Sequence, residues 1–141
     1  MKPTILLIDD SCADAELVRR SLSTGPNSPS LIFAEDGALA LRMLRQTASQ
    51  VDLPDLILLD VNMPRLGGFE ILNELKSDPA LKSIPVVMMS SSETDRDVDK
   101  AYGLHANSYL TKPMDIDGYI KALRSIEEFW FSLTILPGHR H

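Results

Sequence analysis

The sequence predicts an α/β fold in which five parallel strands form a sheet with helices on both faces. The first observation is that short apolar runs alternate five times with longer segments of helical periodicity, as in successive strand–helix units. The second is the run Leu56-Ile57-Leu58-Leu59, which contains no polar residue. Such a run is typical of a strand buried on both faces of a parallel sheet. Crossovers between strands of this kind are right-handed.

Length and composition fit one globular domain. The chain has 141 residues, of which 44% are hydrophobic and 24% charged, as in ordinary globular proteins. Its net charge of −6 argues against a general nucleic-acid binder, which needs a basic face. We find no apolar run long enough to span a membrane and no signal peptide. The one cysteine, Cys12, cannot form an internal disulfide, so we expect a cytoplasmic protein.

The elements are predicted from the spacing of apolar residues. Ala15, Val18 and Leu22, for example, lie three and four residues apart and form one face of the first helix. Segments rich in Gly, Pro, Asn and Ser, such as 24–29, separate the elements. In chain order we expect a strand at 4–8, a helix at 13–23, a strand at 31–34, a helix at 38–47, a strand at 56–59, a helix at 69–77, a strand at 86–89, a helix at 94–104, a strand at 108–111 and a helix at 115–131.

The last two helices differ in apolar content. The helix at 94–104 offers only Val98 and Ala101 as apolar anchors, so it should be the least firmly packed. The final helix has a full apolar stripe, followed by an apolar tail at 133–136 and a frayed end. The residues of that stripe are Ile116, Ile120, Leu123, Ile126 and Trp130.

Polar side chains follow four of the five predicted strands. Each alone is explained by an ordinary turn, helix cap or solvated loop. Parallel strands, however, end at the same edge of the sheet, where open α/β folds bind their ligands. We therefore expect these side chains to form one site. They are Asp9 and Asp10 after the first strand, Asp60 after the third, Ser90 after the fourth and Lys112 after the fifth.

The chemistry of these groups is coherent. Three neighbouring carboxylates disfavour one another's ionisation, and a divalent cation would relieve that repulsion. Oxygen ligands favour Mg²⁺, Mn²⁺ or Ca²⁺ over zinc. An ionised Asp60 could attack phosphorus as a nucleophile, while the metal, Lys112 and Ser90 stabilise the negative charge of the phosphoryl oxygens.

With these residues in this order, the chain resembles the receiver domains of two-component response regulators over nearly its whole length. The resemblance implies a flavodoxin-like (βα)5 fold with strand order 2-1-3-4-5, forming a single receiver domain over 1–141. It also implies that Asp60 accepts a phosphoryl group from a phosphohistidine of a sensor histidine kinase. The matching segments are Ile8-Asp9-Asp10, Leu59-Asp60, Asn62-Met63-Pro64, Gly68, Ser90, Tyr109 and Lys112-Pro113.

The resemblance also assigns roles within the site. It implies that Asp10, Asp60 and the backbone carbonyl of Asn62 bind Mg²⁺ directly, with Mn²⁺ as a substitute, and that Asp9 acts through water. Ser90 would be the switch hydroxyl, and the Lys112–Pro113 peptide bond would be cis, fixing the direction of the lysine. Tyr109 would be the aromatic residue that turns inward with the switch. The alternative for Tyr109 is an ordinary half-buried tyrosine of a strand.

The segment 127–141 extends past the end of a minimal receiver. Its adjacent aromatic residues Phe129, Trp130 and Phe131 cannot all face one core, so at least one should be exposed and could form a partner surface. The extension is similar to that of the small stand-alone regulators paired with cyanobacterial and bacterial phytochromes. That similarity implies a red-light-sensing histidine kinase as donor and a homodimer through the last helix. The alternative is that the aromatic residues only cover the edge of their own domain.

We interpret the chain as a stand-alone phosphoacceptor switch of phosphorelay signal transduction rather than an enzyme. The sequence offers no effector domain, so its output should be a protein–protein interaction or onward phosphotransfer, without contact to DNA or membrane. Two alternatives remain open at this point. One is a phosphatase similar to the haloacid dehalogenases. That family has the motif Asp-x-Asp after its first strand, whereas the two acids are adjacent in this chain. The other is a degenerate receiver that serves only as an interaction module. A flavodoxin-like cofactor binder is disfavoured, because the sequence after the first strand contains no Gly- or Thr-rich phosphate-binding loop.

Overall fold

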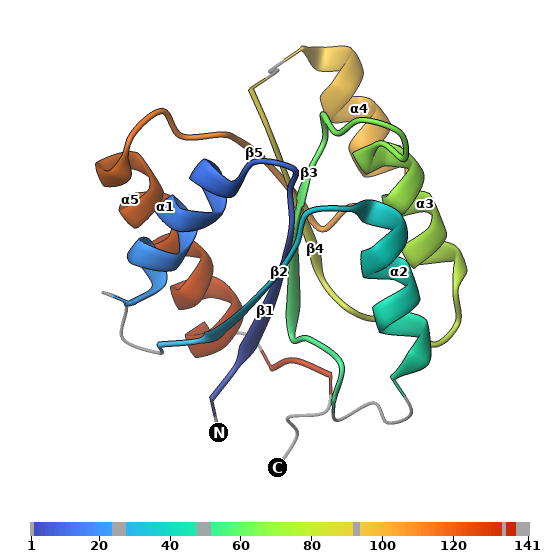
Figure 1. Cartoon of the computed structure of the whole chain (residues 1–141), viewed down its shortest axis with the longest axis horizontal. Helices are drawn as coiled ribbons and strands as arrows, with labels where there is room; N and C mark the ends of the chain where they lie inside the picture. The colour runs from blue at the N-terminus through green and yellow to red at the C-terminus, as the bar shows by residue number, and fades with distance from the viewer. Residues whose placement is uncertain (1, 24–27, 48–51, 92–93, 134, 138–141) are drawn as a thin grey trace.

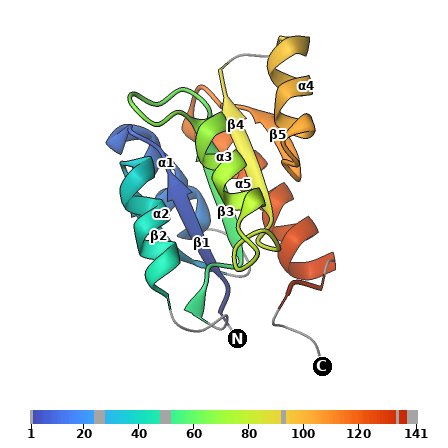
Figure 2. The same ribbon diagram turned by 90° about the vertical axis from the view of Figure 1, so that its right-hand side faces the viewer.

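The fold is a five-stranded parallel sheet covered by helices on both faces. The structure is a computed structural model that describes residues 2–23, 28–47, 52–91, 94–133 and 135–137. The strands lie in the order β2-β1-β3-β4-β5, all parallel, and Figure 2 shows them running in one direction. This confirms the predicted fold class and strand order.

Each predicted element is present, with boundaries that differ by one residue or less except at the last helix. No helix within the described part of the chain is long and apolar enough to cross a membrane. In chain order the elements are β1 (Thr4–Ile8), α1 (Cys12–Ser23), β2 (Ser30–Ala34), α2 (Gly37–Gln46), β3 (Leu56–Asp60), α3 (Gly68–Ser77), β4 (Val86–Ser90), α4 (Asp95–Gly103), β5 (Ser108–Thr111), α5 (Ile116–Glu127) and the π-helical segment η2 (Glu128–Leu133).

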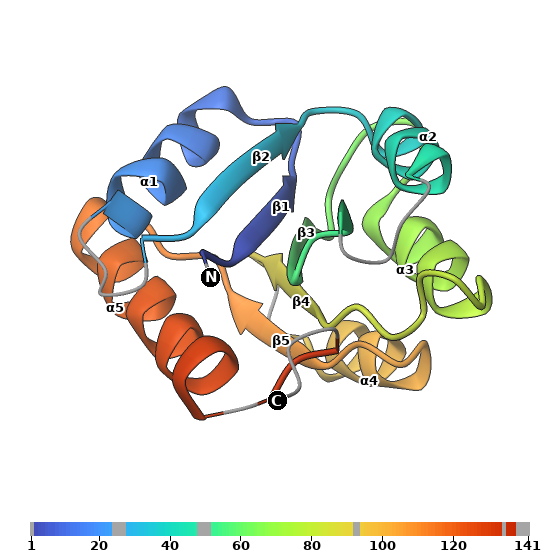
Figure 3. The same cartoon turned by 90° about the horizontal axis from the view of Figure 1, so that it is seen from below.

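Two apolar layers hold the helices against the sheet. Helices α1 and α5 cover one face, and α2, α3 and α4 cover the other (Figures 1 and 3). Because successive side chains of a strand point to opposite faces, Leu6 and Ile8 pack under α2 and α3, whereas Ile5 and Leu7 pack under α1 and α5. Strand β3 is buried along its whole length, as its apolar run predicted.

Helix α4 has few apolar anchors, as predicted. Ala101 is buried, while Val98 is only half-buried. The Lys100 ammonium lies 4.7 Å from the centre of the Phe69 ring on α3, a cation–π contact that adds a polar attachment between the two helices. That α4 is the least stable helix remains a prediction.

The last helix differs from the prediction in two respects. Its α-helical part ends at Glu127 and continues as the π-helical η2. Its buried residues are Tyr119, Leu123, Ile126 and Glu127, whereas Ile116 and Ile120 are only half-buried. The predicted stripe was therefore wrong at its start. Residues 119, 123 and 126 share a face at spacings of four and three, and Tyr119 belongs to the same apolar cluster as Ala15 and Val18 of α1.

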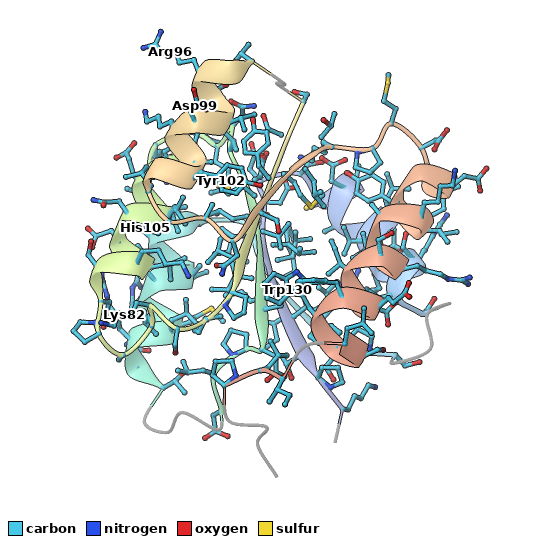
Figure 4. The ribbon with its side chains drawn as sticks, turned by 180° about the vertical axis from the view of Figure 1, so that it is seen from behind. Lys82, Arg96, Asp99, Tyr102, His105 and Trp130 are labelled. Carbon is cyan, nitrogen blue, oxygen red and sulfur yellow. The ribbon has the colours of Figure 1, made fainter. Side chains whose placement is uncertain are left out.

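Of the three C-terminal aromatic residues, Phe129 is 52% exposed, while Trp130 and Phe131 pack against the α1–α5 layer. The rings of Phe129 and Trp130 meet edge to face, with centroids 5.0 Å apart. Figure 4 shows Trp130 directed from the end of α5 toward the sheet. This confirms that the three side chains do not share one core. Within the predicted extension at 127–141, residues 134 and 138–141 lie outside the described residues.

Candidate functional site

Three carboxylates meet at the carboxyl edge of the sheet. Asp9 directly follows β1, Asp60 ends β3, and the two strands are hydrogen-bonded neighbours. Asp10 completes the group, and one carboxylate oxygen from each residue lies within 4.8 Å of the other two. Asp9 and Asp60 are buried, whereas Asp10 is exposed. The structure thus brings together the acids that the sequence placed at one edge, and their oxygen atoms suit a hard divalent cation.

Burial makes this cluster electrostatically costly. Burial, together with the negative charge of Asp9, raises the pKa of Asp60 to about 6, although the Lys112 ammonium lowers it. Burial also raises the pKa of Asp9, against the lowering effect of a hydrogen bond from the Ser11 backbone and of Lys112. Asp60 therefore remains mostly ionised at neutral pH and can act as a nucleophile. A bound cation would relieve the remaining repulsion.

Lys112 reaches into the cluster from the end of β5. Its Nζ lies 3.0 Å from Asp9 Oδ2 and 3.6 Å from Asp60 Oδ1. The shortest of its ion pairs, at 2.7 Å, is with Asp14 Oδ2 in the first turn of α1. Burial lowers the pKa of Lys112, but Asp14, Asp9 and Asp60 raise it more, so the net shift is upward. The ammonium is therefore a permanent positive charge beside Asp60.

The peptide bond between Lys112 and Pro113 is trans, so the cis bond implied by the family resemblance is wrong for this structure. The trans isomer is the intrinsically favoured one, even before proline. The backbone N–H of Lys112 donates to the Ser90 carbonyl at 2.7 Å, which continues the pairing of β5 with β4. That bond and the ion pairs of the side chain direct the lysine toward the acids.

Ser90 is the last residue of β4 and is fully buried. The side-chain amide of Asn62 donates to Ser90 Oγ at 3.2 Å, and the backbone N–H of Asn62 donates to Asp60 Oδ1 at 3.3 Å. Asn62 therefore connects the Asp60 carboxylate with the hydroxyl of Ser90 on the next strand. A change in the charge or size of Asp60 is expected to act on both hydrogen bonds.

Gly68 shapes the loop that follows Asp60. Its N–H donates to the Val61 carbonyl at 3.1 Å. A Cβ atom at this position would lie 2.7 Å from Val61 Cα and closer still to the Asp60 carbonyl oxygen. These neighbours are backbone atoms, which cannot turn aside as a side chain would. The glycine is thus required because α3 begins in close contact with the backbone of Asp60 and Val61.

Tyr109 lies on β5 opposite Met88 of β4. Its ring is partly buried against the layer under α2, α3 and α4. This position suits both interpretations of the residue, a switch element and an ordinary strand tyrosine, so its switch role remains a prediction.

Sequence reasoning missed Asp14, the closest partner of Lys112. Its signal was an acid in the first turn of a helix that begins just after the Asp9-Asp10 pair. Acids are common in the first turn because they interact favourably with the positive end of the helix dipole. That explanation accounts for Asp14 without its ion pair to Lys112, so the sequence gives no reason to expect the pair. Only the packing of α1 beside the end of β5 reveals the contact.

Comparisons with known proteins identify the family to which the chain is similar. A model of the response regulator receiver domain family matches residues 5–124. Response regulator Rcp1 of Synechocystis sp. is 42% identical over 136 residues, which are 95% of this chain and 92% of Rcp1.

Two solved structures superpose on nearly the whole chain. The phosphorylated cyanobacterial phytochrome response regulator RcpA is 38% identical with a TM-score of 0.88, over 98% of this chain and 100% of that one. The Mn²⁺-bound form of Rcp1 is 40% identical with a TM-score of 0.85, over 96% and 99% of the two chains. Fold, site and sequence therefore agree that the chain belongs to the response regulator receiver domain family.

Proposed function

We propose that this receiver is a phosphoacceptor switch in which Asp60 takes a phosphoryl group from a phosphohistidine of a sensor histidine kinase. The observation that carries the proposal is the ionised, buried Asp60 carboxylate, held 3.6 Å from the Lys112 ammonium and grouped with Asp9 and Asp10. This arrangement pairs a nucleophile with a fixed positive charge at an edge of the sheet that is open at Asp10. The complete set of groups argues against a degenerate receiver.

In the proposed step, an Asp60 carboxylate oxygen attacks phosphorus in line with the bond to the histidine nitrogen. The P–O bond forms as the P–N bond breaks, and the electron pair of the broken bond stays on the imidazole. The charge of the phosphoryl oxygens is stabilised by Lys112 and by the Ser90 hydroxyl. Asp60 needs no general base, because it is mostly ionised near neutral pH.

We propose Mg²⁺ as the cofactor, with Mn²⁺ as a substitute. Asp10, Asp60 and the backbone carbonyl of Asn62 would hold the ion directly, and Asp9 would act through water. The ion would neutralise part of the phosphoryl charge. Support comes from the three clustered carboxylates and from Rcp1, a relative whose structure is a Mn²⁺-bound form.

We further propose a red-light-sensing histidine kinase of the phytochrome type as the donor, acting in the cytoplasm. RcpA is described as a phytochrome response regulator, and the regulator RPA3017, 32% identical with a TM-score of 0.86, acts in red light signaling of R. palustris. The test is transfer of labelled phosphate from a phosphorylated phytochrome kinase. Wild type should gain base-labile label and Asp60→Asn should gain none. If a small acyl phosphate labels wild type but the kinase does not, the donor class is wrong.

The proposed output is a protein–protein contact rather than turnover of a substrate. The receiver fold and the adjacent acids Asp9 and Asp10 favour a signalling role over a haloacid-dehalogenase-like phosphatase, in which the motif Asp-x-Asp follows the first strand. Rapid, repeated hydrolysis of a small phosphomonoester by wild type, lost in Asp60→Asn, would revive the phosphatase.

One such contact is proposed to be a homodimer through the end of the last helix. Phe129, Leu133 and Ile135 are exposed apolar side chains there, beside an apolar groove between β5 and α5 that Trp130 lines. Phe129→Asp should lower the dimer content measured by sedimentation. The matched control is Tyr102→Asp, an equally exposed aromatic residue on α4, on the opposite side of the sheet (Figure 4). If Phe129→Asp sediments like wild type, the aromatic residues only cover their own domain.

A further inference from the structure

The Lys112 ammonium is held most closely by an acid that is not part of the proposed metal cluster. Its distance to Asp14 is 2.7 Å, compared with 3.0 Å to Asp9 and 3.6 Å to Asp60. The side chain of Lys112 is 16% exposed and that of Asp14 is 27% exposed. An ion pair this short and this shielded is stronger than an ordinary surface pair.

A phosphoryl group on Asp60 would compete for the same ammonium. Lys112 carries one positive charge and three N–H donors. In the structure the acids Asp9, Asp14 and Asp60 already surround them. A phosphorylated Asp60 presents more negative charge and new acceptor oxygens, so the ammonium must move toward it from its present place near Asp14. The strength of the Asp14 contact therefore opposes binding of an anion at Asp60.

Asp14 has a second potential partner on α5. Tyr119 is fully buried, and its hydroxyl makes no hydrogen bond of favourable length and angle with any of the described residues. Burial raises the pKa of Tyr119, and Asp14 raises it further through its negative charge and as a nearby hydrogen-bond acceptor. The Asp14 carboxylate is therefore close to the hydroxyl without forming a well-aligned hydrogen bond with it. A buried, unsatisfied donor is costly. Tyr119 can therefore gain a hydrogen bond if the Asp14 carboxylate turns toward it.

We propose that Asp14 is a positioning residue for Lys112: it holds the ammonium in the resting state, releases it to the phosphoryl group on Asp60, and then accepts a hydrogen bond from Tyr119. The inference rests on the proposed role of Asp60 as phosphoacceptor. It connects the site to the contact between α1 and α5, because Asp14 and Tyr119 belong to those two helices.

The test is a titration with beryllofluoride and Mg²⁺, an analogue of the phosphoryl group. Asp14→Asn keeps the shape of the side chain but removes the charge that competes for Lys112, so it should bind beryllofluoride about threefold to tenfold more tightly than wild type. The matched control is Glu16→Gln, which removes one charge from the same helix but contacts Arg19 and Arg20 instead. Its affinity should stay within about twofold of wild type. Equal or weaker binding by Asp14→Asn would overturn the proposal.

Tyr119→Phe separates this account from a general effect of charge. Without the hydroxyl, Asp14 loses its replacement partner, so beryllofluoride binding should weaken about twofold to fivefold. The same substitution should have a smaller effect in the Asp14→Asn background, because the neutral amide oxygen is a weaker acceptor than the carboxylate and no longer has to be drawn away from Lys112. Equal effects of Tyr119→Phe in both backgrounds would contradict the role of Tyr119.

A direct readout is the NMR signal of the Lys112 ammonium. In wild type it should shift when beryllofluoride binds, and this measurement needs no substituted protein. A bound anion that leaves the signal unchanged would overturn the release of Lys112. If wild type binds no beryllofluoride, the proposed function fails by itself. The ion pair is then tested separately, because Asp14→Asn should shift the Lys112 signal and Glu16→Gln should not.

Discussion

Strand β3 contains two regions that respond to burial in opposite ways. Residues Leu56 to Leu59 are fully buried, and each such apolar side chain contributes about 1.5–3 kcal/mol to folding. Asp60, the next residue, is buried equally well, but burial raises its pKa to about 6 from 3.8, which corresponds to a cost of about 3 kcal/mol when it is ionised. Burial of the apolar residues therefore stabilises the fold, and this stabilisation offsets the cost of burying the charged Asp60 at the end of the same strand.

The largest expected effect lies in the apolar region. Leu58→Ala should destabilise the protein by about 2–5 kcal/mol, because it removes a fully buried side chain and leaves a cavity. Chemical denaturation measures the change. Leu39→Ala on the exposed face of α2 is the control and should stay within about 0.5 kcal/mol of wild type. Similar losses of unfolding free energy from both substitutions would contradict the claim that burial of Leu58 stabilises the fold.

At the other end of the strand, a substitution should raise the free energy of unfolding instead of lowering it. Without metal, Asp60→Asn should stabilise the protein by about 2–3 kcal/mol above pH 6, because the amide is not penalised as a buried charge is. The free energy of unfolding is measured in a chelating buffer.

The pH dependence follows from the raised pKa. A folded-state pKa of about 6 means that the cost of ionising Asp60 is complete above pH 6 and disappears as the pH falls toward 3.8. The advantage of Asp60→Asn should therefore shrink over that interval. An advantage that does not change with pH would mean that desolvation of Asp60 is not its cause.

The smallest expected effect concerns Asp10, the exposed member of the cluster. Asp10→Ala should change the stability of the metal-free protein by less than about 1 kcal/mol, yet weaken Mg²⁺ binding by at least about tenfold, because it removes a direct ligand. Calorimetric titration measures the affinity, and Asp36→Ala, outside the cluster, is the control. An unchanged Mg²⁺ affinity would count against the proposed metal site.

Most of the fold could be predicted because its determinants are local. The apolar run of β3, the helical spacing in α1 and the alternation of strands and helices depend on neighbours in sequence. The site was predictable for a related reason. Parallel strands end at one edge, so residues that follow them, such as Asp9, Asp60 and Lys112, had to come together.

What was missed depends on tertiary packing. The contact of Asp14 with Lys112 requires α1 to lie beside the end of β5, which no local pattern encodes. The same holds for Tyr119, whose burial depends on how α5 is turned against α1, and for the π-helical η2. The trans bond before Pro113 differs from the family pattern, and Lys112 is directed by its acids instead.

The most direct test of phosphoacceptance by Asp60 is the intact mass after treatment with a small acyl-phosphate donor. Wild type and Asp60→Asn are compared with and without Mg²⁺, and a parallel beryllofluoride sample checks for rapid hydrolysis. The account predicts one added phosphoryl group that requires both Mg²⁺ and Asp60. No added mass together with no beryllofluoride binding, or an equal gain in Asp60→Asn, would contradict it.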